Sequence, residues 1–215
     1  MSSPEGNRYE FLDQHKRDAF ISLLLSGLFV GLSYLYLSTN TQLYIFSLGV
    51  ISLAYVLPLL SKRLRDLEGT KIIFIAGVWA AVCMAGIFEE LPLLIFALLF
   101  VQLFSFIFSL TIPFDVRDIH LDSKAQVSNL NEFISLPALS KLIVSLLITA
   151  CLCTLALYLL EYFDLFLSIF LLAFYSVQGL LTFDLTKSHS EFYYLITLDG
   201  LILFKGLLFL LAWSI

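Results

Sequence analysis

Three aspartates stand at the end of one of the most apolar segments of the chain, in the stretch "PFDVRDIHLDSK". On a helix, the spacing of Asp115, Asp118 and Asp122 puts the three carboxylates within roughly 60° of one another. Carboxylates so close together repel, and a hard divalent cation such as Mg²⁺ removes the repulsion because it prefers oxygen ligands. The spacing therefore predicts a site for Mg²⁺ and a diphosphate group, with a solvated acidic helix end as the alternative.

The elements that must position these aspartates are apolar helices. The chain has 215 residues and is only 13% charged, about half of what is typical for a soluble domain. Apolar windows long enough to cross about 30 Å of hydrocarbon recur, without the short alternating segments of a membrane β-barrel. The predicted fold is an all-α transmembrane helix bundle, with residues 1–215 as a single domain. Its seven predicted spans are 20–37, 43–60, 72–88, 92–113, 141–160, 165–183 and 196–214.

Positive charge is confined to one side of this predicted bundle. Of the 12 Lys and Arg residues, all except Lys205 fall in or beside the N-terminal segment and three alternate loops. By the positive-inside bias, that side is cytoplasmic. The polar segment 1–18 and the motif loop 114–140 are then cytoplasmic. We expect a multi-pass protein of the plasma (inner) membrane that contacts membrane lipid and no nucleic acid.

Two stretches resemble conserved motifs of the UbiA-type intramembrane prenyltransferases. "FDVRDIHLD" is similar to the second aspartate-rich motif of that family. "YVLPLLSKRLRDLEGTKIIFIAGVW" resembles its Tyr-x-Pro…Lys-Arg loop, which is followed by an apolar helix with a Trp. The two stretches occur in the order that the family shows.

The resemblance implies a bundle of normally nine helices, in which two aspartate-rich motifs hold Mg²⁺ and a prenyl diphosphate. Such enzymes transfer the prenyl group to a lipophilic acceptor. Carried over position by position, the metal ligands would be Asp115, Asp118 and Asp122. The diphosphate would be neutralised by Lys62 and Arg63, with Arg117 assisting.

The chain departs from the family pattern at its start. No cluster like the first aspartate-rich motif precedes Tyr55, and the predicted helices match the last seven of nine. The segment after the second motif also differs, since it reads "QVSNL". Three explanations stay open: a fragment, a partner chain that supplies the missing motif, or a homologue without catalysis. We expect no prenyl transfer by this chain alone; the alternative function is a non-catalytic protein of the same fold that binds an isoprenoid or a partner.

Two ionisable residues fall within the last predicted helix. A charge inside the membrane costs at least about 2.5 kcal/mol, so each should face the bundle interior or a wet cavity. We expect Lys205 to bond Gln102 or Gln178, whereas Asp199 either lines the cavity or is exposed. Small, buried and unreactive thiols are expected at Cys83, Cys151 and Cys153.

Overall fold

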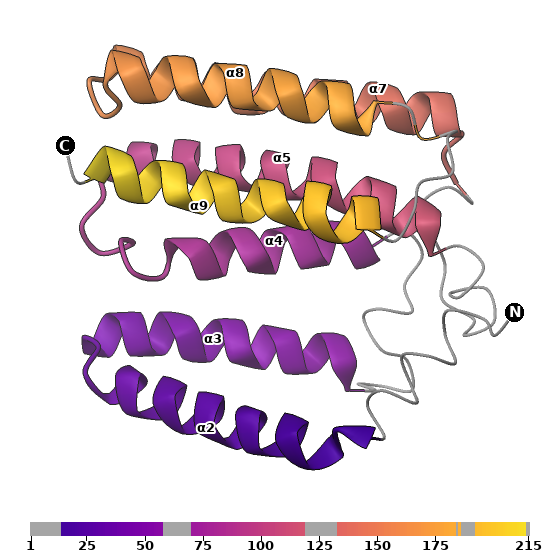
Figure 1. Cartoon of the computed structure of the whole chain (residues 1–215). Helices are drawn as coiled ribbons and strands as arrows, with labels where there is room; N and C mark the ends of the chain where they lie inside the picture. Colours follow the sequence, from indigo (N-terminus) through magenta and orange to yellow (C-terminus); the bar gives the residue numbers. More distant parts are fainter. Residues whose placement is uncertain (1–13, 58–69, 119–132, 184, 186–191, 214–215) are drawn as a thin grey trace, which may run out of the picture. The chain divides into compact units, whose positions relative to one another are not determined.

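The computed structural model describes residues 14–57, 70–118, 133–183, 185 and 192–213. Within these ranges, every regular element is a helix (Figure 1). The chain divides into two compact units, Met1–Tyr44 and Ile45–Ile215. The prediction of an all-helical protein is therefore confirmed for the described residues.

The first unit contains α2 (Lys16–Leu35) and the beginning of α3 (Thr39–Val56), which continues into the second unit. A tight turn joins the two helices. Ser38 caps α3, because its hydroxyl oxygen accepts a hydrogen bond of 3.1 Å from the Thr41 amide and satisfies one orphan donor of the first turn. Gln42 and Tyr34 close the turn through two reciprocal side-chain to backbone hydrogen bonds of 3.0 Å.

The second unit contains the rest of α3 and the remaining helices, which are α4 (Lys71–Met84), α5 (Leu93–Arg117), α7 (Leu136–Leu159), α8 (Leu165–Thr182), η3 (Tyr193–Leu198) and α9 (Asp199–Trp213). Helix α5 is central, because it packs against α4, α7 and α8. Helix α8 also packs against α7 and α9 (Figure 1). The core of this unit thus forms around the face of α5 that bears the aspartate motif at its end.

Helix α4 contacts α5 through a narrow apolar stripe with small residues at its centre. Ile72, Ala76, Ala80 and Met84 are buried at successive four-residue intervals, which places them on one face of the helix. Alanine at the two middle positions lets the helices approach closely, as is common between helices in membranes. This close approach brings the first residue of α4, Lys71, beside the last turns of α5.

Helices α7 and α8 are joined by a turn with recognisable capping. The carboxylate of Asp164 accepts a hydrogen bond of 2.7 Å from the Leu167 amide and caps α8, which begins at Leu165 as predicted. At the end of α7, the Tyr162 amide donates to Leu157 and the Glu161 amide to Tyr158, both at 2.9 Å. This is a Schellman motif, and Glu161 occupies its left-handed position with φ of 58°.

The predicted loop 114–140 is shorter than expected at both ends. Helix α5 does not stop at Pro113 but continues to Arg117, because the ring is accommodated inside the helix. Proline removes the backbone hydrogen bond to the carbonyl of Ser109 there, and its ring crowds that carbonyl. Helix α7 begins at Leu136 instead of residue 141, since Pro137 stands in its first turn, where proline favours helix initiation.

The other predicted ends differ by a few residues. Helix α4 ends at Met84 instead of residue 88. The amides of Ala85, Ile87 and Glu90 each bond a carbonyl three residues earlier, so the chain tightens into turns that cannot continue an α-helix. The last predicted helix begins earlier, at Tyr193, as a π-helix.

Four helices of the structure are long and apolar enough to cross a membrane. They are α2, α5, α7 and α8. Helix α4, with 14 residues, is a shorter apolar helix. The membrane character predicted from the composition is thus supported by the lengths of the helices.

Candidate functional site

The end of α5 carries two of the three predicted aspartates. Asp115 lies in the last turn, and Asp118 is the first residue beyond the helix, where its amide donates to the Phe114 carbonyl at 3.0 Å. The third aspartate, Asp122, lies outside the described residues, as do the predicted diphosphate residues Lys62 and Arg63. The described site therefore consists of the α5 terminus and the side chains that contact it.

Asp115 forms an ion pair with the first residue of α4. The ammonium nitrogen of Lys71 lies 3.4 Å from a carboxylate oxygen of Asp115, and their side chains are 19% and 2% exposed. A cation at a helix N-terminus and an anion at a helix C-terminus each oppose the helix dipole. The pair offsets both unfavourable placements, since α4 begins where α5 ends. Sequence reasoning missed Lys71 because nothing in the chain indicates which residue of α4 faces Asp115.

Asp118 is paired with its neighbour. The guanidinium of Arg117 donates from Nε to Oδ1 at 2.6 Å and from Nη2 to Oδ2 at 3.1 Å. Both carboxylate oxygens are thus engaged by one planar group, the strongest geometry for such a pair. The two described aspartates are each neutralised by a cation, and their mutual repulsion is reduced without a metal.

The same guanidinium lies against two aromatic rings. Its central carbon is 5.1 Å from the ring centre of Phe114 and 4.7 Å from that of Tyr194, within the range of a cation–π contact. Phe114 and Tyr194 also contact each other, with ring centres 5.5 Å apart. Arg117 therefore connects the end of α5 to the beginning of the last helix.

Tyr194 belongs to the π-helix η3, an element that the sequence pattern did not predict. π-helical turns are rare and are frequent at functional sites. The turn is attached to α8, because the Tyr193 hydroxyl donates a hydrogen bond to the Leu181 carbonyl. Tyr194 is only 6% exposed, and its ring packs against the guanidinium of Arg117.

The residue types at this site suit Mg²⁺, but their described arrangement is an ion-paired one. Among the residues that the structure describes, no three His, Cys, Asp or Glu side chains are grouped so that they could hold a metal ion. Asp115 and Asp118 supply hard oxygen atoms, which Mg²⁺ prefers. For either to ligate a metal, it would have to exchange the cation that it now contacts.

Comparison with known proteins does not assign this site. No protein-family model matches the sequence, and no curated protein or solved structure matches it significantly.

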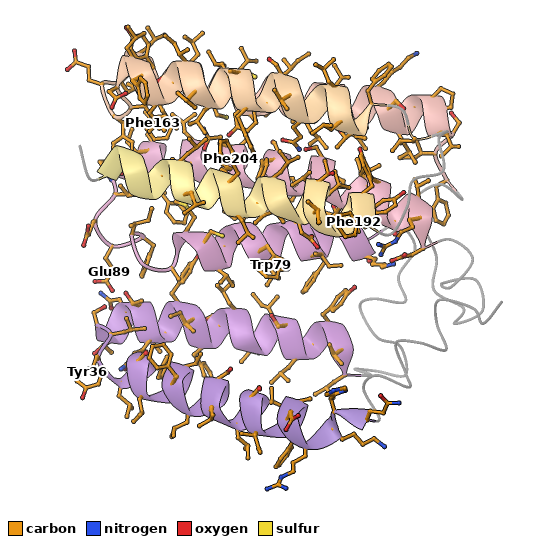
Figure 2. All side chains as sticks on the ribbon, viewed as in Figure 1. Tyr36, Trp79, Glu89, Phe163, Phe192 and Phe204 are labelled. Atoms are coloured by element: carbon orange, nitrogen blue, oxygen red, sulfur yellow. The ribbon has the colours of Figure 1, made fainter. Side chains whose placement is uncertain are left out.

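The acidic pair Glu89-Glu90 lies at the other end of the second unit. Both residues are exposed in the turn between α4 and α5. Figure 2 shows Glu89 at one end of this unit and Phe192, which precedes η3, at the opposite end. This pair is therefore separate from the α5 terminus.

A second group of polar side chains lies in the bundle interior. Lys205 of α9 is 3% exposed and donates a hydrogen bond of 3.0 Å to the Tyr175 hydroxyl. The Thr154 hydroxyl of α7 accepts a hydrogen bond of 2.7 Å from the Gln102 amide of α5. These two buried hydrogen bonds thus join α9 to α8 and α5 to α7.

These contacts correct the expected partner of Lys205. The ammonium nitrogen contacts Tyr175 and lies 4.1 Å from the ring centre of Phe106, whereas Gln102 bonds Thr154. Gln178 donates to the Ser109 hydroxyl at 2.6 Å instead. The prediction failed because the rotation of each helix decides which side chains meet, and the sequence does not encode that rotation locally.

The other expectations have mixed outcomes. Of the cysteines, only Cys153 is buried, while Cys151 is half-buried and Cys83 is exposed on α4. The prediction of three buried thiols is therefore wrong: α4 turns Cys83 away from the stripe that packs on α5. Asp199 is half-buried at the start of α9.

Proposed function

We propose that the chain is a multi-pass membrane protein with a UbiA-like bundle, in which α3, α4 and the η3–α9 segment also span the membrane. The apolar composition of these helices supports this proposal, as does the one-sided distribution of Lys and Arg. The N-terminus is then cytoplasmic, and the end of α5 opens at the cytoplasmic face of the plasma (inner) membrane.

We infer that the end of α5 binds the diphosphate group of a prenyl diphosphate. The observation that carries this proposal is the grouping of Lys71, Asp115, Arg117 and Asp118 at the end of an apolar helix pair. A prenyl diphosphate likewise combines an apolar part, its long hydrocarbon chain, with a charged part, its strongly anionic head. The apolar helices suit the chain, and the cations suit the head.

Binding of a Mg²⁺–diphosphate head would rearrange the two ion pairs. Asp115 and Asp118 would turn from Lys71 and Arg117 to the metal, and the released cations would bind phosphate oxygens. Each charge keeps an opposite partner throughout, so the exchange leaves no carboxylate uncompensated near the membrane. Bound Mg²⁺ would stabilise the negative charge that develops on a departing diphosphate. Lys62, Arg63 and Asp122 would complete the site by resemblance to the family.

Transfer of the prenyl group to a lipophilic acceptor is the reaction that this site would serve. In the family that the chain resembles, two aspartate clusters hold the metal ions from opposite sides, and this sequence has one. We therefore propose that catalysis requires a second cluster from outside this sequence, either from a partner chain or from a longer form of the protein.

The ion pairs themselves favour a second candidate. Because Lys71 and Arg117 already neutralise the described aspartates, the site is electrostatically balanced without metal. A non-catalytic member of the same fold, which binds an isoprenoid or a partner protein, would need no more than this.

Calorimetric titration of the purified chain with farnesyl diphosphate tests the proposal. We expect Mg²⁺-dependent binding that Asp118→Asn weakens about tenfold, because the amide keeps the shape and removes the charge. The matched control is Asp164→Asn, which removes one carboxylate at the α8 cap, where asparagine caps equally well. Affinity that is independent of Mg²⁺ and of Asp118 would reject the diphosphate site and favour the non-catalytic candidate.

A further inference from the structure

The position of Arg117 depends on groups from two distant parts of the chain. Asp118 engages its Nε and Nη2 atoms, whereas the rings of Phe114 and Tyr194 lie 5.1 Å and 4.7 Å from its central carbon. Asp118 and Phe114 are local, since they belong to the same helix end. Tyr194 is distant in the sequence and reaches Arg117 only through tertiary folding.

Tyr194 is itself held firmly. Its ring contacts Phe114 and stands edge-on to Tyr193, with ring centres 5.5 Å apart in each pair. Tyr193 is bonded to the Leu181 carbonyl of α8. A ring fixed in this way restricts the directions in which the flexible Arg117 side chain can point.

We propose that Tyr194 is a positioning residue for Arg117 during diphosphate binding, an inference that rests on the proposed function. When Arg117 turns from Asp118 to a phosphate oxygen, it loses its two hydrogen bonds to the carboxylate. A cation–π contact depends on the charge of the guanidinium and takes up none of its N–H groups in a hydrogen bond, so these donors can still bind an anion. Tyr194 thus keeps Arg117 at the helix end while its hydrogen-bonding partner changes.

Farnesyl diphosphate affinity of four variants tests this role. Tyr194→Phe keeps the ring and should bind within twofold of the wild type. Tyr194→Leu removes the ring face and should bind about fivefold more weakly, as expected for a partly exposed cation–π contact. In an Arg117→Gln background, Tyr194→Leu should cause no further loss, because Tyr194 would act only through Arg117. Thermal unfolding verifies that each variant is folded.

A series of variants with gradually weakened ring faces distinguishes loss of the cation–π contact from a folding defect. Replacing Tyr194 with phenylalanine analogues that carry one, two and three ring fluorines preserves the shape and weakens the negative ring face stepwise. Affinity should fall at each step.

The outcomes separate this inference from the proposed function. Wild-type binding together with undiminished affinity of Tyr194→Leu and of the fluorinated series would overturn the positioning role alone. An equal loss from Tyr194→Leu with and without Arg117 would also overturn it, because the ring would then act by another route. Absence of farnesyl diphosphate binding by the wild type would overturn both.

Discussion

Lys71 and Asp115, the first residue of α4 and a residue in the last turn of α5, form an ion pair of 3.4 Å at the edge of the apolar core. The carboxylate is almost fully buried and the ammonium group is partly exposed. Removal of one partner should therefore affect stability more than removal of the other, because a buried charge without a partner costs more free energy than a charge that reaches solvent.

Removing Lys71 should destabilise the protein more than removing Asp115. Lys71→Met leaves a buried carboxylate without this partner, at a cost of about 3 kcal/mol. Asp115→Asn leaves an ammonium group that can still reach solvent, so we expect roughly half that loss. Denaturant unfolding in detergent measures both. Equal losses would show that solvent reaches Asp115 more easily than its burial indicates.

The two ends of the second unit should lie on opposite sides of the membrane. After replacement of the native cysteines, Glu90→Cys in the α4–α5 turn should react with a membrane-impermeant maleimide in intact cells. Phe133→Cys, before α7, should react only after lysis, because the positive-inside bias places that loop in the cytoplasm. Labelling of Phe133→Cys in intact cells would reverse the topology.

Replacing Glu161 with glycine should stabilise the turn between α7 and α8. Glu161 has φ of 58°, a conformation that costs an ordinary residue about 1 kcal/mol and glycine nothing. Part of this gain is lost to the flexibility of glycine in the unfolded chain, so we expect about 0.5 kcal/mol. Glu161→Val serves as the contrast and should destabilise. Thermal unfolding of the two variants decides the sign.

The Tyr175 hydroxyl should matter only while Lys205 is present. Tyr175→Phe removes the acceptor of the Lys205 hydrogen bond and keeps the ring, so we expect a loss of about 1–2 kcal/mol. In a Lys205→Met background the same change should cost much less, since no buried ammonium group is left without its acceptor. A double-mutant cycle of unfolding free energies measures the difference. Additive losses would mean that the hydroxyl does not act through Lys205.

The chain alone should not transfer prenyl groups. One aspartate cluster positions and stabilises the diphosphate from one side only, and each missing electrostatic contribution is worth on the order of 3 kcal/mol. Purified chain incubated with farnesyl diphosphate, Mg²⁺ and quinone-type acceptors should form no product above background. Robust turnover would locate a second metal site in residues that the resemblance does not identify.

The sequence by itself determined the class of the protein and the placement of most helices. Hydrophobicity and helix capping are local properties, so the apolar spans and the start of α8 after Asp164 could be predicted directly. The spacing of Asp115 and Asp118 likewise identified the helix end where charge collects. The predicted end of this helix at residue 113 was too early, because packing against neighbouring helices carries α5 on to Arg117.

Tertiary structure decided which side chains meet. Lys71 contacts Asp115, Tyr194 contacts Arg117, and Lys205 contacts Tyr175, and each pair joins different helices. Such contacts depend on the rotation and axial register of packed helices, which result from the combined packing of many apolar residues. No short stretch of sequence contains that information, so the acidic motif was visible in the sequence while its neutralising partner Lys71 and the ring behind Arg117 were not.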